Sequence, residues 1–306
     1  MNSHSGRATA PRRSQRTRQV SSPPAEPPPV VSARWLLAAF ALTLLLAALC
    51  WYATLGLLFY QGQWQLLFHP SRSITATPAT AGLAFSEIHF DVTDTGAPQL
   101  DGWWIPAAAG APYSADTILY LHHGRGSLSD TVPALAALHA LGINVFAFDY
   151  RGFGHSAGAH PTERLATADS IAAWTYLTDT RNLQPRSLVV MGDGTGATFA
   201  AHLGAVFAPA GVILEDPSPS AGQVFQRDAR ARMLPMWLLQ KEKLDPSGDL
   251  ARAEVPRLFL ARHRDAARTL QLFRGASFPK EYFDLRSESP AVVVATLRRF
   301  LDDTLH

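Results

Sequence analysis

The sequence predicts an α/β protein with a mostly parallel, eight-stranded sheet flanked by helices, preceded by a transmembrane helix. Two patterns indicate this. Short apolar runs alternate with longer amphipathic segments, which is typical of a parallel sheet covered on both faces. One long uncharged apolar segment lies near the N-terminus. With 306 residues, 47% of them hydrophobic, the chain can hold one large domain plus an appendage, or two small domains.

Residues 1–33 are rich in Ser, Arg, Ala and Pro and lack apolar periodicity, so we expect a disordered tail. The formal net charge of +2 conceals a cluster of arginines before residue 35, where Glu26 is the only acidic residue. The rest of the chain has no basic face with interleaved aromatic residues. The sequence therefore predicts no nucleic-acid partner.

Residues 35–60 contain no charged side chain, and about 20 apolar residues suffice to cross a bilayer. Trp35 at one end and Trp51 and Tyr60 toward the other suit the two interfaces. The preceding arginines predict a cytoplasmic N-terminus and a globular domain on the outer, periplasmic or extracytoplasmic, side. A cleaved signal peptide would have a shorter apolar region that ends in small residues, and a buried core helix would be shorter.

The only cysteine, Cys50, lies inside this apolar segment, so the chain can form neither an intramolecular disulfide nor a thiolate metal site. Leu49 stands before Cys50, where lipid attachment normally follows a small residue, and this disfavours lipidation. His122 and His123 have no further ligand at metal spacing. We therefore expect no metal and no cofactor.

Residues 61–82 form a connector, and residues 83–306 form the globular domain. Leu165, Ala168, Ile171, Ala172 and Thr175 lie on one face at helical spacing. Helices are predicted at 130–141, 162–179, 196–207 and 290–303. Strands are predicted at 85–92, 100–105, 117–121, 144–149, 188–192, 211–215 and 257–261, with a weaker one near 278–285.

Three glycine-containing segments each follow a predicted strand. The first, at 120–126, reads Tyr-Leu-His-His-Gly-Arg-Gly, and the second, at 148–158, reads Phe-Asp-Tyr-Arg-Gly-Phe-Gly-His-Ser-Ala-Gly. The third, at 188–197, is a strand, the turn Gly-Asp-Gly-Thr-Gly and a helix start. The three glycines of the second segment permit a tight backbone path close to a site.

The three segments resemble the α/β-hydrolase superfamily, in its branch of serine-aminopeptidase-like, membrane-anchored serine hydrolases. The resemblance covers about residues 63–303 and is most specific at 148–158 with the following Pro-Thr-Glu, and at the connector 66–70. It implies the α/β-hydrolase fold and a G-x-S-x-G nucleophile elbow. It also implies oxyanion-hole backbone N–H groups from Arg125 and Thr195, and a pocket near His123, Gly124, Tyr150 and His155.

The sequence departs from this pattern at the elbow, where Gly194 occupies the position of the nucleophilic serine. Hydrogen replaces the side chain, so no oxygen is available for attack. Asp193 as nucleophile would need small residues at Met191 and Thr195, and Thr195 as nucleophile would need them at Asp193 and Ala197, so neither register fits.

The other two triad members should follow in the order acid, then histidine. By resemblance Asp265, shortly after the strand at 257–261, is the candidate acid. It could instead cap a loop or pair with a neighbouring arginine. Residues 276–289, where the histidine belongs, contain none, and Tyr282 or Phe283 stands near its place. His263 is too close to Asp265 in sequence, and His306 is terminal.

Residues 216–255 form an insertion that we expect to act as a small cap. Its apolar residues suit an acyl chain or the membrane surface, or could simply pack on the sheet. We favour a catalytically degenerate hydrolase that retains a pocket for a small apolar or acyl ligand or a protein partner. The alternatives are an active esterase or acyl hydrolase, in which Asp265 and the backbone amides of Arg125 and Thr195 hold a water, and a structural subunit of a membrane complex.

Overall fold

Helix α1 (Ala33–Gly62) opens the described part of the chain, which in this computed structural model comprises residues 31–92, 99–158, 160–262 and 266–306. Among the described helices it is the one long and apolar enough to cross a bilayer. The chain divides into two compact units after Tyr52, so α1 contributes its last turns to the second unit.

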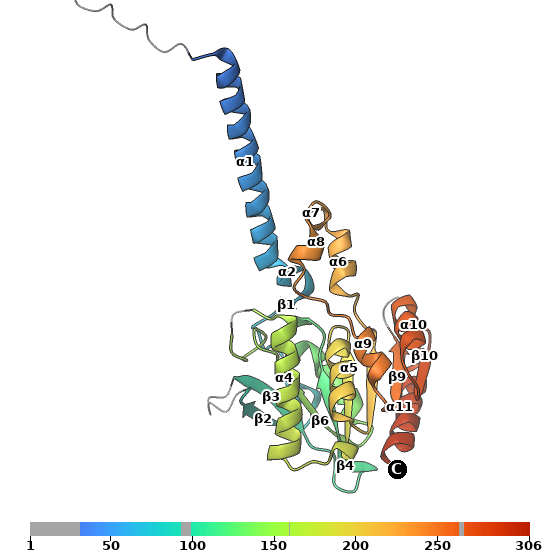
Figure 1. Cartoon of the computed structure of the whole chain (residues 1–306). Helices are drawn as coiled ribbons and strands as arrows, with labels where there is room; N and C mark the ends of the chain where they lie inside the picture. The colour runs from blue at the N-terminus through green and yellow to red at the C-terminus, as the bar shows by residue number, and fades with distance from the viewer. Residues whose placement is uncertain (1–30, 93–98, 159, 263–265) are drawn as a thin grey trace, which may run out of the picture. The chain divides into compact units, whose positions relative to one another are not determined.

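The second unit is built on an eight-stranded sheet with the order β10-β9-β8-β7-β4-β6-β3-β2 (Figure 1). Pairing is parallel from β10 to β6, and β3 runs antiparallel to both β6 and β2. Each of the eight expected strands is present, which confirms the mostly parallel sheet. The strands are β2 (Ser86–Phe90), β3 (Leu100–Ile105), β4 (Tyr113–Leu121), β6 (Ile143–Phe148), β7 (Leu188–Asp193), β8 (Gly211–Glu215), β9 (Arg257–Ala261) and β10 (Lys280–Asp284).

Helices cover both faces of this sheet because its central strands are apolar on both sides. One core cluster includes side chains of α4 and α5, and a second includes side chains of α3 and α11. The helices are α3 (Val132–His139), α4 (Glu163–Thr175), α5 (Gly196–Phe207), α9 (Ser247–Arg252), α10 (Ala266–Gly275) and α11 (Pro290–Leu305). Short turns are η1 (Pro78–Ala81), η2 (Leu128–Thr131), η4 (Pro185–Ser187) and η3 (Tyr176–Thr180), a π-helical turn that extends α4.

The helix expected at 162–179 is present as α4, but the stripe of residues noted in the sequence is not its most buried face. Leu165, Ala168, Ile171 and Ala172 are only partly buried and Thr175 is exposed, whereas the buried residues are Ala166, Asp169, Ser170, Ala173 and Trp174. The helix is rotated because its two buried polar side chains have partners. Asp169 pairs with Arg151, and the Ser170 hydroxyl donates to the Ala166 carbonyl at 2.8 Å. An apolar pattern cannot detect a polar residue that becomes satisfied by tertiary contacts.

Besides α9, the insertion contains three short helices, α6 (Ala221–Arg227), α7 (Ala229–Arg232) and α8 (Met236–Leu239). Phe225 is buried, whereas Trp237 is 87% exposed and Leu238 is 64% exposed. The cap therefore both packs inward and leaves apolar surface outside.

The end of α1 packs against this cap within the second unit. Phe59 meets Phe225 edge-on, with ring centroids 5.5 Å apart. Gln63 donates from Nε2 to the Leu239 carbonyl at 3.2 Å and accepts from the Lys241 N–H at 2.9 Å. Helix α2 (Trp64–Leu67) follows directly.

Candidate functional site

The elbow between β7 and α5 keeps its backbone turn. Gly194 has φ +59°, in the left-handed region that glycine adopts without strain. Its N–H donates to the Glu215 carbonyl at 2.9 Å, and its own carbonyl accepts from the Ser218 N–H at 3.0 Å. The turn is therefore tied on both sides to the end of β8 and the segment after it.

The two glycines that flank the turn are required by close backbone approach. A Cβ at Gly192 would lie 2.4 Å from the Gly196 carbonyl oxygen. A Cβ at Gly196 would lie 2.0 Å from the Leu121 carbonyl oxygen. Both distances are far below van der Waals contact, so close packing requires small residues at both positions, as at a nucleophile elbow.

The loop after β4 lies against the elbow. A Cβ at Gly124 would lie 3.1 Å from the Thr195 Oγ1 and 3.1 Å from the Phe68 ring. The Arg125 N–H donates to the His123 carbonyl at 2.8 Å, so that amide is committed within the loop. The Thr195 N–H has no hydrogen-bond acceptor among the described residues. Of the two expected oxyanion-hole donors, Thr195 is the one left free in this structure.

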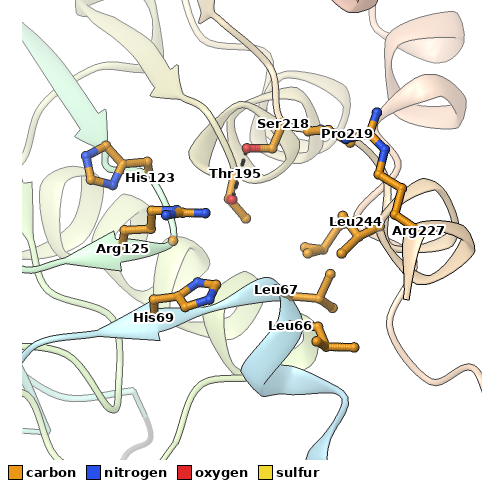
Figure 2. Close-up of a pocket in the computed structure, with 12 residues that line it drawn as sticks. Leu66, Leu67, His69, His123, Arg125, Thr195, Ser218, Pro219, Arg227 and Leu244 are labelled. Carbon is orange, nitrogen blue, oxygen red and sulfur yellow. Dashed lines mark hydrogen bonds between the residues drawn. The ribbon is translucent and has the colours of Figure 1, made fainter. Parts of the chain in front are cut away.

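A pocket of about 570 Å³ opens beside Thr195 (Figure 2). Expected residues His123, Gly124, Arg125 and Thr195 all line it. Sequence reasoning missed most of the opposite wall, although the connector at 66–70 was part of the family resemblance. The missed residues are Leu66, Leu67, His69, Ser218, Pro219, Val224, Arg227 and Leu244.

The connector reaches the pocket through a second, two-stranded sheet. Strands β1 (His69–Pro70) and β5 (Arg125–Gly126) pair in parallel, with His69 opposite Arg125. The His69 N–H donates to the Gly124 carbonyl at 2.7 Å. Burial, and secondarily the positive charge of Arg125, lowers the pKa of His69. A neutral imidazole therefore stands beside a guanidinium at the pocket wall.

Tyr150 and His155 do not line this pocket. Tyr150 is buried beneath it, and its hydroxyl donates to the His122 carbonyl at 3.2 Å. His155 instead lines a small separate hollow beside Asp101 and Asp149. The segment after β6 turns away toward β3, where the Asp101 N–H donates to the Ser156 hydroxyl at 3.0 Å.

A buried pair lies under the loop after β4. His122 is fully buried, its Nδ1 lies 2.6 Å from the His123 carbonyl, and its Nε2 lies 3.5 Å from Asp149 Oδ1. Burial lowers the pKa of His122 to about 3 and raises the pKa of Asp149 to about 7. Both shifts disfavour the charged forms, so the pair is neutral between about pH 3 and pH 7.

Asp265 and His263 lie outside the described residues. Tyr282 lies on β10 and packs against Phe273, with ring centroids 5.6 Å apart. His306 stacks on Tyr113 at 5.8 Å, at the start of β4 and hence at the edge opposite the elbow. His306 therefore cannot serve as the base.

Comparison with known proteins agrees with this geometry. Residues 113–248 match the family model described as serine aminopeptidase, S33. The chain is 27% identical over 254 residues to the uncharacterized protein Rv2307c of Mycobacterium tuberculosis, covering 79% of this chain and 88% of that protein. It is 30% identical over 121 residues to human alpha/beta hydrolase domain-containing protein 17B, covering 39% and 42% of the two chains.

Among solved structures, the esterase Pf2001 of Pyrococcus furiosus superimposes with a TM-score of 0.63 at 20% identity. The match covers 78% of this chain and 99% of the esterase. The strand order, the elbow between β7 and α5 and these similarities together show that the chain has the α/β-hydrolase fold and belongs to the α/β-hydrolase superfamily.

Proposed function

We propose that this protein is a membrane-anchored member of the superfamily that has lost serine hydrolysis and uses the retained pocket to bind a ligand. The observation that carries the proposal is Gly194 at the apex of an otherwise intact elbow. The turn, the flanking glycines and the free Thr195 N–H are what a nucleophile would need around it, and the side-chain oxygen is missing.

The hydroxyls near the apex do not replace the missing serine. The Thr195 hydroxyl donates to the Ser218 hydroxyl at 3.3 Å, and this contact supplies no base that could remove a proton. A triad acts as a unit, and an oxyanion hole without one leaves only about 10³–10⁴-fold acceleration over water. Efficient ester hydrolysis is therefore not expected.

Helix α1 supports the membrane anchor, because it is long and apolar enough to span a bilayer. The arginines that precede it support a cytoplasmic N-terminus, with the globular domain on the outer side. Protease protection in spheroplasts, whose outer envelope no longer excludes the protease, tests this arrangement. Cleavage of the globular domain by protease added outside supports it, and full protection contradicts it.

The decisive experiment is active-site labelling of the full-length protein with a fluorophosphonate. We expect no labelling of the natural protein or of Gly194→Ala. Gly194→Ser should label when a histidine is also introduced after β10, as Ser287→His or Glu288→His, because both positions are exposed in the turn that follows the strand. Gly194→Ala is the matched control, since it places the same Cβ at φ +59° without an oxygen.

Ester turnover by the natural protein would contradict the proposal. Robust hydrolysis of short-chain or long-chain esters that disappears in Asp265→Ala would establish instead an esterase with a non-standard apparatus. That alternative draws support from the free Thr195 N–H and from the esterase among the structural neighbours.

A further inference from the structure

Two arginines of the pocket wall have no partner among the described residues. Arg125 on β5 and Arg227 at the end of α6 form no ion pair or hydrogen bond through their guanidinium groups. Elsewhere in the domain Arg151 and Arg262 are each held by a carboxylate. Figure 2 shows Arg125 and Arg227 on opposite sides of the pocket, with Thr195 between them. None of the described residues that line the pocket is acidic.

This arrangement favours an anionic group. Guanidinium groups bind phosphate and carboxylate through paired, charge-assisted hydrogen bonds. The free Thr195 N–H, at the start of the 12-residue helix α5, adds a further donor on the same side. The neutral His69 ring can also donate one hydrogen bond.

One part of the pocket wall is apolar. Leu66, Leu67, Val224 and Leu244 form that part of the lining. Leu66 also lines a second hollow of about 200 Å³. That hollow is otherwise formed by Leu55, Leu58, Phe59, Gly62, Gln65 and Arg230. Leu66 thus separates the cationic pocket from a hollow that the apolar side chains at the end of α1 line, together with Gln65 and Arg230.

We propose that the pocket binds a single-chain lipid with an anionic headgroup, its head between Arg125 and Arg227 and its chain passing Leu66 toward the end of α1. The inference deepens the proposed function, because it names the class of ligand for the same pocket. A free anion would leave the leucine wall uncovered, and a neutral chain would leave both arginines without a partner.

The test uses full-length protein in phosphatidylcholine nanodiscs and photoactivatable C16 lipids with the same chain and three heads: phosphate, phosphocholine and trimethylammonium. We expect the phosphate lipid to crosslink about tenfold more than the other two, with adducts in residues 53–69. Arg125→Gln and Arg227→Gln should each reduce its crosslinking about tenfold, the loss expected for one hydrogen bond to a charged group. Unchanged thermal unfolding verifies that each variant folds.

Arg186→Gln is the matched control, because Arg186 is exposed and lies in η4, which precedes β7 at the edge of the sheet opposite the elbow. It should leave crosslinking unchanged. Equal crosslinking by the three heads, or equal loss in Arg186→Gln, would overturn the inference. So would complete competition by millimolar inorganic phosphate, which would identify the ligand as a free anion.

Labelling the same samples with fluorophosphonate separates the two proposals. A labelled natural protein that still prefers the anionic lipid would defeat the loss of hydrolysis and leave the ligand class standing. An unlabelled protein without headgroup preference would overturn the ligand class and leave the proposed loss of hydrolysis standing.

Discussion

At the scale of single residues, burial keeps both His122 and Asp149 uncharged. The folded and unfolded states hold a single proton on different residues of this pair. In the unfolded chain the histidine is protonated below pH 6.5 and the carboxyl is ionised above pH 3.8. In the folded protein the carboxyl holds the proton and the histidine does not. Between about pH 4 and 6.5 both states therefore bind one proton, and the pair contributes no pH dependence to stability.

Removing either side chain should make the free energy of unfolding depend on pH through the titration of the other side chain. In Asp149→Asn, the unfolded state alone takes up a proton on His122, so the free energy of unfolding should fall as the pH falls from 6.5 to 4. In His122→Gln, the folded state alone keeps the proton on Asp149, so stability should fall as the pH rises from 4 to 7. Each slope should be about 1 kcal/mol per pH unit. Urea unfolding across this range measures both.

The natural protein is the reference, since every other titrating group is common to all three chains. Asn at position 149 can still accept the Leu128 N–H, which donates to Asp149 Oδ1 at 3.0 Å. Slopes of the same sign in the two variants would contradict a neutral pair.

Residues of the site differ in how far the sequence could predict them. Gly194, Thr195, His123 and Gly124 could be placed because they lie in two short segments, 120–126 and 188–197, whose glycine spacing determines the local turns. Arg227 and Ser218 could not, because they reach the pocket only through the packing of the cap and of the segment after β8. Tyr150 and His155 were expected at the pocket because they follow a sheet strand, but the backbone turns away after β6.

At the scale of secondary-structure elements, α4 is oriented by a buried ion pair. Asp169 is fully buried, and its carboxylate accepts from the Arg151 side chain at 2.5 Å and from the Arg151 N–H at 2.8 Å. Burial raises the pKa of Asp169 to about 6, while both Arg151 contacts act in the opposite direction. The pair joins α4 to the segment after β6.

Asp169→Ala should destabilise the protein by about 3–5 kcal/mol, because Arg151 is left mostly buried without its partner. Asp249→Ala is the control on α9, where the carboxylate pairs with the exposed Arg252 and with His202. It should cost about 1 kcal/mol or less. Chemical denaturation of the two variants measures the difference. Equal losses would show that α4 is oriented by its apolar contacts alone.

The elements themselves were largely predictable, and their orientation was less so. Strands β8 and β9 and helix α5 match the expected ranges because turn residues and continuous apolar runs delimit them. The buried face of α4 was not predictable, since Asp169 and Ser170 are polar in sequence and become buried only once Arg151 and the helix backbone satisfy them.

At the scale of the whole molecule, the boundary between helix and domain falls inside α1. Residues 53–62 belong to the second unit, where Phe59 packs on Phe225 and the following Gln63 forms hydrogen bonds with Leu239 and Lys241 of the cap. Hydropathy could predict where the apolar segment lies. It could not predict that the end of this segment is also part of the domain core.

A shortened chain that begins at Ala53 should therefore melt within a few degrees of the full-length protein. One that begins at Trp64 should lose about 3–5 kcal/mol from the exposed Phe225 and the lost hydrogen bonds, a fall of about 10 °C in the melting temperature. Circular dichroism in the same detergent compares the two. Equal melting temperatures would contradict the assignment of residues 53–62 to the domain.

The pairing of β1 with β5 fixes the number of residues between the end of α1 and the pocket wall. Leu66 and His69 belong to the stretch of chain that leaves the helix, yet they form the wall facing the elbow. One residue inserted or deleted between Gly62 and His69 would slide β1 along β5 and exchange which side chains face the cavity. The length of this segment therefore determines which of its side chains face the pocket.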